Sequence, residues 1–315
     1  MSSQPIAVEI KNLVKRFGDF VAVDNVSLTV LRGEIFGFLG SNGAGKTTTI
    51  RMLCGLLTPT SGSARVGGFD LAAQAEQIKQ TIGYMSQRFS LYDDLSVVEN
   101  IDFFSGVYNV PRAMRPARKE YVLKMAGLEN RGNTMTRLLP AGWKQRLALG
   151  CAILHQPPIL FLDEPTSGVD PIARRNFWDL IYQLSAAGHT VFVTTHHMDE
   201  AEYCHRLALM HRGRLIGLGA AGELKAALVS HTLMHLESTD VLESLRIVEQ
   251  CEEVVEVAVF GSGLHLMVRD PAVGEQAVRQ ALAERGIGIR RLAVIEPSME
   301  DVFVAMIEQE ERRTS

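Results

Sequence analysis

The sequence has little of what marks membrane-spanning and nucleic-acid-binding proteins. Its hydrophobic stretches are short, Ile159–Leu162 among them, and none reaches the roughly 20 apolar residues that a membrane-spanning helix needs. Lys and Arg number 32 against 36 Asp and Glu, so the formal charge of -4 gives no basic excess for neutralising a phosphate backbone. We therefore expect neither a membrane-spanning segment nor nucleic acid as a partner.

Secretion signals and cysteine pairs are also missing. Residues 1–5 lack the basic and apolar stretches of a secretion signal, which favours a cytoplasmic location. The cysteines are too far apart in the sequence to form the close pair of a metal site or redox motif: Cys54, Cys151, Cys204 and Cys251. We expect reduced thiols without a functional role.

The remaining pattern predicts a large α/β domain, since 46% of the residues are hydrophobic and 315 residues exceed the usual size of one domain. Residues 6–39 cluster Val, Ile, Leu and Phe between turn signals, which predicts short strands. Residues 46–57 predict a helix that begins directly after a glycine-rich turn. Strand-like runs at 159–162 and 190–194 flank a helical stretch at 174–187, as in a parallel sheet with crossover helices.

A helical subdomain is predicted at about residues 88–155, within the large domain. Ser96 can cap a helix with Glu99 three positions on, and Pro111 opens another helical segment. Trp143–His155 carries apolar residues at helical spacing.

The composition changes after Leu228, and residues 229–315 predict a separate small α+β domain. Residues 308–315 are mostly charged or polar, so we expect them to be frayed. Strand-like and helix-like runs alternate in this region, the strands at 232–236, 253–260, 263–268 and 289–295, the helices at 240–249 and 273–285.

The strongest signal is a phosphate-binding loop between a predicted strand and a predicted helix. Its glycines let successive backbone N–H groups converge on phosphate oxygens, and the dipole of the following helix adds to the attraction. Lys46 should contact the β- and γ-phosphates, and Thr47 supplies a hydroxyl for Mg²⁺. An ordinary glycine turn is the alternative, which the full motif in this context disfavours. The loop comprises Gly40, Ser41, Asn42, Gly43, Ala44, Gly45, Lys46, Thr47 and Thr48.

An apolar run that ends in two carboxylates is the second signal. Ile159–Leu162 is followed by Asp163 and Glu164, as expected of a buried strand that delivers acids to its carboxyl end. Asp163 would hold Mg²⁺, directly or through water, and Glu164 would polarise the water that attacks the γ-phosphate. A strand that runs into an acidic turn is the alternative, and the phosphate loop disfavours it.

Further segments then follow in the order typical of the ABC ATPase family: Gln87 after Tyr84-Met85-Ser86, Ser167-Gly168-Val169-Asp170, and Thr194-Thr195-His196. With the two signals above, they make residues 6 to about 220 resemble that family. The resemblance implies an α/β fold, with a P-loop ABC ATPase cassette over residues 1–228. This cassette would contain an N-terminal β-subdomain and the helical subdomain, followed by the small α+β domain.

Roles for three residues also follow from the resemblance. Gln87 would be the lid glutamine that contacts the Mg²⁺ site and couples it to a membrane partner. Asp170 would belong to the loop exchanged between two protomers, and His196 would be the switch histidine that reaches the γ-phosphate. The respective alternatives are a surface amide, a turn residue before Pro171 and the neighbouring His197 as the switch residue.

Phe17 lies at the family position whose aromatic ring stacks on adenine. A core phenylalanine on a β-hairpin is the alternative reading of this residue. The sequence offers no second adenine contact that would decide between them.

The family signature, usually Leu-Ser-Gly-Gly-Gln, is altered in this chain. In the family, its serine hydroxyl and glycine amides bind the γ-phosphate held by the opposite protomer. Pro140 offers neither a hydroxyl nor an N–H, but a helix beginning at Trp143 could still present its amides, with Ala141 and Gly142 as contacts. Alternatively, the segment has lost phosphate sensing and Trp143 covers apolar surface. The segment reads Leu139-Pro140-Ala141-Gly142-Trp143.

Two segments resemble family regions outside the nucleotide site. Phe89–Ser96 resembles the region that receives a short helix from the membrane subunit, and an ordinary loop with a helix cap is the alternative. Glu296–Phe303 resembles the C-terminal extension of exporter ATPases of the drug and ion efflux type, which stabilises or regulates the dimer. Its alternative is a helix capped by Ser298, with Asp301 three positions later.

The resemblance therefore implies a subunit that binds and hydrolyses ATP, with ATP and Mg²⁺ as cofactors, to power a membrane ABC transporter of exporter type. Its partners would be separate transmembrane permease subunits and a second cassette, either an identical chain or a sister. It would lie on the cytoplasmic side of the inner or plasma membrane, held there by the permease.

Two other functions remain open at this point. A soluble ABC protein acting on ribosomes or DNA is one, although such proteins usually carry tandem cassettes or long coiled-coil insertions, and this sequence has neither. A catalytically impaired subunit that pairs with an active sister is the other, because Pro140 and Trp143 replace signature residues.

Replacing Lys46 tests the phosphate loop. Lys46→Ala is expected to abolish tight ATP binding, because it removes the cation that meets the β- and γ-phosphates. Titration calorimetry with ATP and Mg²⁺ measures this, with Lys79→Ala as the control outside the motifs. Unchanged ATP affinity in Lys46→Ala would contradict the assignment of the loop.

Overall fold

The computed structural model describes residues 5–87, 91–227 and 232–314, and the chain divides into two compact units. The first unit comprises Met1–Ala221 with Arg313–Ser315, and the second comprises Gly222–Arg312. The boundary predicted from the sequence, residue 228, lies outside the described residues. The structural division falls earlier in the chain.

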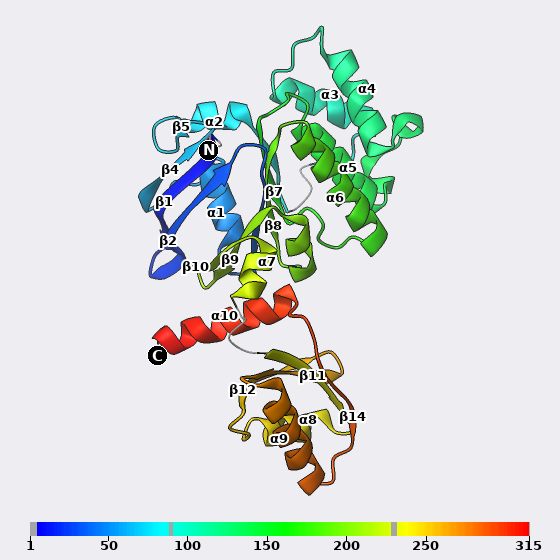
Figure 1. The fold of residues 1–315 in the computed structure, drawn as a ribbon. Helices are drawn as coiled ribbons and strands as arrows, with labels where there is room; N and C mark the ends of the chain where they lie inside the picture. Colours follow the sequence, from blue (N-terminus) through cyan, green and yellow to red (C-terminus); the bar gives the residue numbers. More distant parts are fainter. Residues whose placement is uncertain (1–4, 88–90, 228–231, 315) are drawn as a thin grey trace. The chain divides into compact units, whose positions relative to one another are not determined.

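A six-stranded sheet forms the centre of the first unit (Figure 1). In spatial order its strands are β10 (Arg214–Gly219), β9 (Arg206–His211), β3 (Ile35–Gly40), β8 (Thr190–Thr195), β7 (Ile159–Asp163) and β6 (Ile82–Met85). Only β10 is antiparallel to its neighbour. Strands β3, β7 and β8 are buried along their whole length, which explains their continuous apolar runs. The predicted parallel sheet is confirmed.

A second, antiparallel sheet packs on the first through helix α1 (Lys46–Leu53). One apolar cluster joins Ile10 of the small sheet, Phe38 and Phe161 of the large sheet, and Ile50 of α1. Because β3 leads directly into α1, the turn between them is held at the edge of this core. The strands of the second sheet lie in the order β2 (Phe20–Leu31), β1 (Ile6–Phe17), β4 (Ser61–Val66) and β5 (Phe69–Asp70), with α2 (Ala75–Thr81) following β5.

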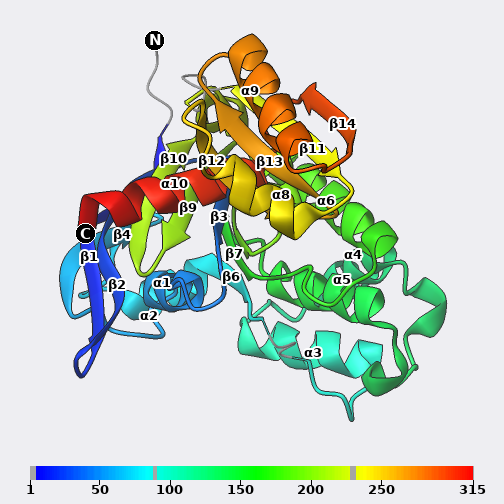
Figure 2. The same cartoon turned by 90° about the horizontal axis from the view of Figure 1, so that it is seen from below.

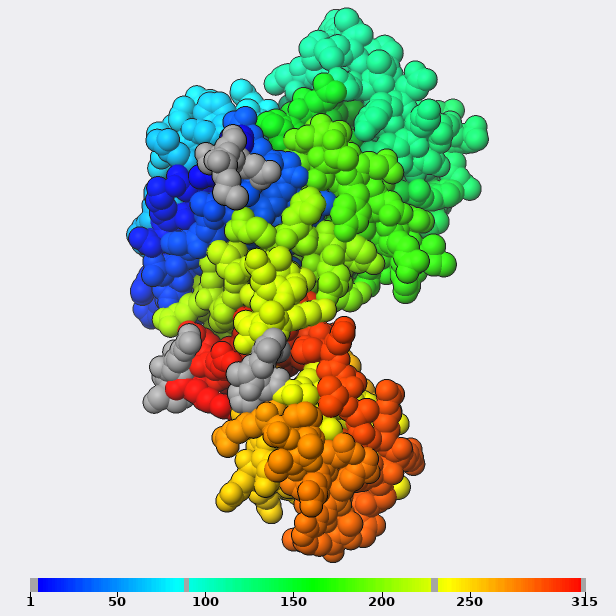
Figure 3. Space-filling model, viewed as in Figure 1, coloured from blue at the N-terminus to red at the C-terminus, as the bar shows by residue number. Residues whose placement is uncertain are grey.

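The predicted helical subdomain consists of α3 (Val97–Val107), α4 (Arg115–Ala126) and α5 (Ala141–Ala152). They enclose an apolar cluster of their own that includes Ile101, Val122 and Leu147. In the space-filling view, the teal residues of this subdomain form a lobe, and green residues lie between this lobe and the blue N-terminal strands (Figure 3). Short 3-10 helices connect its elements at Glu129–Arg131 and Thr136–Leu138.

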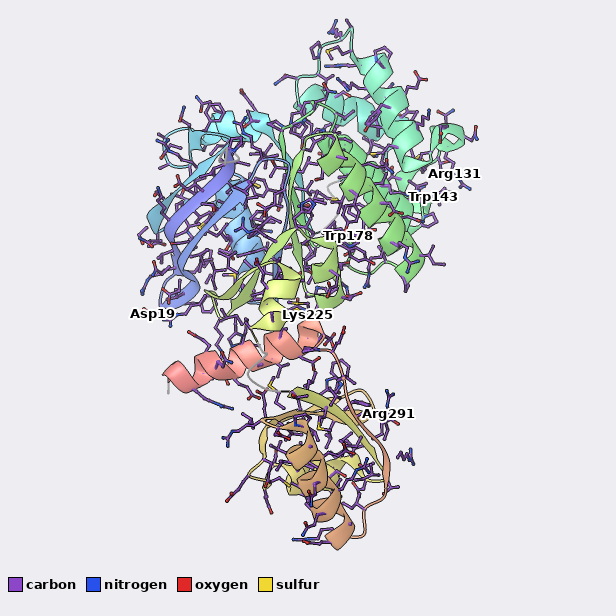
Figure 4. The ribbon with its side chains drawn as sticks, in the orientation of Figure 1. Asp19, Arg131, Trp143, Trp178, Lys225 and Arg291 are labelled. Carbon is purple, nitrogen blue, oxygen red and sulfur yellow. The ribbon has the colours of Figure 1, made fainter. Side chains whose placement is uncertain are left out.

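Helix α6 (Pro171–Ala186) covers the face of the large sheet that α1 leaves free. Its Trp178 is buried against Leu160 and Val193 of the sheet, and its label in Figure 4 marks this packed layer. Figure 2, in which the molecule is seen from below, shows α5 and α6 on one side of the sheet and α1 on the other. A 3-10 helix, Met198–Tyr203, follows β8.

The second unit is built on a four-stranded antiparallel sheet with the order β12-β13-β11-β14. Helices α8 and α9 pack on this sheet around Leu236, Leu266, Val278 and Leu282. The predicted α+β domain is confirmed. Its elements are β11 (Thr232–Ser238), α8 (Val241–Val248), β12 (Val254–Phe260), β13 (Gly263–Val268), α9 (Pro271–Glu284), β14 (Ile289–Val294) and α10 (Met299–Thr314); α7 (Ala221–Ala226) precedes them.

The start of α10 has the predicted cap. Asp301 Oδ2 accepts hydrogen bonds from the backbone N–H and the hydroxyl of Ser298, while Asp301 N donates to the Ser298 hydroxyl at 3.3 Å. Its other oxygen, Oδ1, pairs with Nδ1 of His265 on β13. The cap and the attachment of α10 to the sheet thus share one carboxylate.

Several predicted helix ends are wrong. Helix α4 begins at Arg115 rather than at Pro111, since residues 112–114 form a turn. Helix α10 continues to Thr314, although residues 308–315 were expected to fray; Arg312 pairs with Glu308 one turn before it at 3.3 Å. Helix α1 stops at Leu53 because Gly55, with φ of 67°, turns the chain away. Helix α5 begins at Ala141 rather than at Trp143, since the Pro140 carbonyl already accepts the amides of residues 143 and 144.

Removing the cap of α3 tests how this subdomain is stabilised. The Ser96 hydroxyl donates to the Glu99 carboxylate at 2.7 Å and accepts Glu99 N at 3.3 Å, so Ser96→Ala loses both hydroxyl bonds, while the bond from the backbone N–H of residue 96 to the Glu99 carboxylate at 2.8 Å remains. We expect a loss of about 1 kcal/mol in the free energy of unfolding, measured by denaturant titration. Ser63→Ala, at an exposed strand position, is the control. Equal stability of the two variants would contradict the prediction.

Candidate nucleotide site

The phosphate loop joins the buried strand β3 to α1 at the carboxyl edge of the large sheet. Gly45, the cap of α1, has φ of 106°, and a Cβ there would lie 2.3 Å from the Ala22 carbonyl oxygen. Only glycine fits this turn. Ser41, Asn42 and Gly43 are exposed at the loop tip, while Ala44 is buried. The end of the loop at Gly45 is therefore packed against Ala22 of β2, while the tip of the loop is exposed to solvent.

Lys46 is held under the loop. Its Nζ donates to the carbonyl oxygens of Gly40 at 2.7 Å and Ser41 at 3.1 Å, and lies 3.4 Å from Glu164 Oε1. Only 3% of the side chain is exposed. Burial lowers the pKa of Lys46, and the charges of Glu164 and Asp163 oppose that shift. This ammonium group lies at the floor of the loop, and its contact with phosphate stays a prediction.

Asp163 is the last residue of β7, and its two carboxylate oxygens differ in their hydrogen bonds. Its Oδ1 accepts hydrogen bonds from the hydroxyls of Thr194 at 2.7 Å and Thr47 at 3.0 Å. Its Oδ2 is buried and has no hydrogen-bond partner among the described residues. Burial raises the pKa of Asp163 against the effect of these two hydrogen bonds, and a cation nearby would favour the ionised form.

These oxygen donors fit Mg²⁺. A hard cation prefers carboxylate and hydroxyl oxygens, and Asp163 Oδ2 and the Thr47 hydroxyl are such ligands. Within the described residues, no group of three or more His, Cys, Asp and Glu side chains could hold a metal ion. A cation here would therefore complete its shell with phosphate and water, as Mg²⁺ commonly does.

Glu164 is the point on which the predicted residues converge. Its carboxylate lies against Lys46, accepts a hydrogen bond from Gln87 Nε2 at 2.9 Å and lies 3.2 Å from His196 Nδ1. Its backbone is left-handed, with φ of 48°, which is uncommon for a residue with a side chain. The Thr194 hydroxyl and carbonyl oxygen both accept Glu164 N, at 2.9 and 3.1 Å, and so hold this conformation.

The geometry distinguishes the two histidines. His196 faces Glu164, whereas His197 Nε2 lies 3.4 Å from Nη2 of Arg174 on α6. The structure thus places the preferred histidine in the site, and its contact with a γ-phosphate stays a prediction. Gln87 is exposed but donates a hydrogen bond to the Glu164 carboxylate, and its contact with a metal stays a prediction.

Other predicted residues lie apart from this cluster. Among the described residues, Phe17, Ala141, Gly142 and Asp170 make no hydrogen bond or ion pair with it. Phe17 is 50% exposed near the tip of the β1–β2 hairpin, with Lys15 Nζ 5.0 Å from its ring centre, so the core alternative is wrong, and stacking on adenine stays a prediction. Asp170 caps α6 by accepting the amides of residues 172 and 173.

The altered signature forms the start of α5. Gly142 packs so closely on α6 that a Cβ would lie 2.8 Å from the Ala173 methyl group. Trp143 is half-buried on the subdomain core, and the Arg131 guanidinium lies 4.0 Å from its ring centre (Figure 4). The packing role of Trp143 is therefore present, and phosphate contact by Ala141 and Gly142 stays a prediction. Of the region predicted to meet a membrane partner, residues 89 and 90 lie outside the described residues.

Sequence reasoning overlooked Thr194, whose hydroxyl touches both members of the acid pair. It donates to Asp163 and accepts the Glu164 amide, so it holds the two acidic residues in place together. The signal available was a threonine at the carboxyl end of a strand predicted to be parallel to the acid-bearing one. That signal gains meaning only once the two strands are known to be neighbours.

Comparison with known proteins agrees with this geometry. The ABC transporter family profile matches residues 23–167, and the profile of the C-terminal domain of DrrA1-3-like ATP-binding proteins matches residues 219–307. The Nod factor export ATP-binding protein I of Cupriavidus metallidurans is 37% identical over 97% of this chain and 98% of its own length. The chain belongs to the ABC transporter ATP-binding family.

Other members of the family agree with the cassette. The probable multidrug ABC transporter ATP-binding protein YbhF of Escherichia coli is 53% identical over 70% of this chain, which spans only 38% of YbhF. A solved ATP-binding cassette, a dimer in a post-hydrolysis state with ADP and phosphate, is 27% identical with a TM-score of 0.62, over 68% of this chain and 98% of its own. The predicted P-loop ABC fold is confirmed.

Thr194 provides a test of the site. Thr194→Val keeps the shape but leaves the Asp163 carboxylate and the Glu164 amide each one partner short, so we expect a loss of about 1–3 kcal/mol in unfolding free energy. Weaker Mg²⁺-dependent ATP binding should accompany it. Thr194→Ser retains the hydroxyl and is expected to match the wild type in both denaturant titration and calorimetry. A serine variant as damaged as the valine variant would count against this role.

Proposed function

We propose that this ABC cassette binds ATP with Mg²⁺ and hydrolyses it to drive an exporter built with separate transmembrane subunits. The observation that carries the proposal is the convergence of Lys46, Gln87 and His196 on the Glu164 carboxylate. A buried cation, a carboxylate and an imidazole around one point can hold a phosphate and activate water. The family membership and the export relative, similar over its whole length, support the same function.

Phosphate capture is the first proposed step. Lys46 is bonded to two neutral carbonyl oxygens, and it would exchange them for anionic phosphate oxygens, which are stronger acceptors. The glycines of the loop allow its backbone N–H groups to point at the same oxygens. Asp163 and Thr47 would hold Mg²⁺, which supplies positive charge to neutralise the phosphate oxygens. Phe17, exposed at its hairpin, would stack on adenine.

Glu164 is the proposed base. A water molecule in hydrogen-bond contact with its carboxylate would give up a proton to it as the water oxygen bonds to the γ-phosphorus and the bond to ADP breaks. Lys46 loses its Glu164 contact when phosphate takes its place, which makes the carboxylate a better proton acceptor. His196, already beside Glu164, would donate a hydrogen bond to a γ-phosphate oxygen.

A dimer and a membrane partner complete the proposal. The start of α5, which is the altered signature, would contact the nucleotide of a second cassette through its backbone amides. Asp170 would lie in the exchanged loop. The exposed Tyr92 ring, 4.6 Å from that of Phe103, would receive the permease. Within the described residues, no helix is long and apolar enough to cross a bilayer. From the family membership and the export relative, we propose that the permease holds the chain on the cytoplasmic side of the membrane.

ATPase turnover against protein concentration tests this function. We expect turnover to rise cooperatively with concentration, because two cassettes close on the nucleotide. Glu164→Gln should retain ATP binding, lose turnover by roughly a thousandfold and accumulate as an ATP-bound dimer in light scattering, since the amide cannot take the proton. Glu252→Gln, the same change at an exposed position of the second unit, is the control.

The outcomes separate the candidate functions. A Glu164→Gln variant that hydrolyses ATP at the wild-type rate refutes the proposed base. Wild-type chain without turnover and without an ATP-driven dimer points to the impaired subunit, which Pro140 and Trp143 favour, or to a need for the permease. Crosslinking from position 92 in membranes then identifies the partner.

A further inference from the structure

Arg174, which no step above uses, lies in the first turns of α6 and reaches three side chains beside the site. Its Nη2 lies 3.4 Å from His197 Nε2, its Nη1 3.4 Å from Asp199 Oδ2, and its Nε 3.7 Å from Glu200 Oε1. The Arg174 side chain is 21% exposed and that of Glu200 is 0% exposed. One guanidinium thus spans the segment that follows His196.

The pairing of Arg174 with Glu200 is incomplete. Thr166, in the loop after the acid pair, donates its hydroxyl to Glu200 Oε1 at 2.7 Å. Arg174 Nε and Glu200 Oε2 are both buried without a hydrogen-bond partner among the described residues. A buried ion pair with an unpaired donor and acceptor is a poor device for stability, because desolvation costs more than the contact returns. The arrangement therefore calls for another explanation.

His197 connects Arg174 to the nucleotide site. The rings of His196 and His197 lie 4.2 Å apart, and His196 Nδ1 faces Glu164. A guanidinium can only donate, so the His197 nitrogen that faces it must accept, which places the ring proton on Nδ1. Burial lowers the pKa of His197, and Arg174 and His196 lower it further, so this neutral form is favoured.

Arg174 is also tied to the start of α6. Its backbone N–H donates to the carbonyl oxygen of Asp170 at 2.9 Å, within the turn that the Asp170 carboxylate caps. The same residue therefore bonds to Asp170 through its backbone and to His197 through its side chain. A displacement of the turn at Asp170 would move the guanidinium with it.

We propose that Arg174 is a positioning residue for His196: by holding His197, it fixes the His196 ring against Glu164 and makes that placement depend on the turn at Asp170. The inference rests on the proposed hydrolysis, in which His196 acts on the nucleotide. Closure of two cassettes at Asp170 would then be communicated to the γ-phosphate end of the same cassette through one side chain.

Steady-state ATPase kinetics test this role. Arg174→Met removes the guanidinium but keeps an apolar stem, and we expect kcat to fall about tenfold to a hundredfold while the KM for ATP stays within about twofold. Arg174→Lys is expected to be as slow, because an ammonium group cannot reach His197, Asp199 and Glu200 together. Arg175→Met, on the next residue of α6, is the matched control and should turn over at the wild-type rate.

A double-mutant cycle separates positioning from structure. In a His196→Ala background, Arg174→Met should cause no further loss of the residual single-turnover rate, since it acts through the missing ring. A merely structural arginine would lower the rate by the same factor in both backgrounds, or would be replaced fully by lysine. Either of those results overturns the proposal.

Histidine-ring NMR of the nucleotide-free chain tests the positioning of His196 independently of ATP hydrolysis. Arg174→Met is expected to shift the ring signals of both His196 and His197, at a melting temperature close to that of Arg175→Met, which should shift neither. An unmoved His196 signal refutes the positioning role. Wild-type chain without ATPase activity, combined with a moved His196 signal, would refute the proposed function and leave the positioning of His196 standing.

Discussion

The parallel register of three strands is the constraint on which the site depends. β8 lies between β3 and β7, with Thr195 opposite Leu39 and Thr194 opposite Asp163. Because the strands run in one direction, their carboxyl ends meet at one edge, and segments distant in sequence come within hydrogen-bond distance there. A slip of one residue in β8 would turn the Thr194 hydroxyl to the opposite face of the sheet and leave the acid pair without its support.

The features that the sequence predicted well have local causes. The phosphate loop can be recognised from the order of its residues. Gly45 has a backbone conformation that residues with side chains rarely adopt, so a glycine is needed there, and Lys46 follows it directly. The caps at Ser96 and Ser298 are equally local, since each hydroxyl meets a carboxylate three residues further on. Residues of this kind carry their geometry in their spacing, so no knowledge of the fold is needed to find them.

What escaped prediction depends on contacts between distant segments. Thr194 had no predicted role beyond its place in a family segment, and Arg174 none beyond its place in a helical stretch, until the pairing of β7 with β8 and the packing of α6 gave them partners. The sequence did not decide whether Phe17 lies in the core or stacks on adenine at the surface, because an aromatic residue on a hairpin can occupy either face. The end of α10 was not predicted because its polar residues show no apolar spacing typical of a helix. The helix is supported there by the pairing of Arg312 with Glu308, one turn earlier.

The two contacts of the Asp301 carboxylate limit which substitutions this chain can tolerate. One oxygen caps α10 through Ser298 and the other bonds to His265 on β13, so a change at position 301 breaks the start of a helix and its attachment to the sheet at once. Drift at any of the three positions is therefore constrained by the other two. Among related sequences, these residues should be inherited as a set or be replaced as a set.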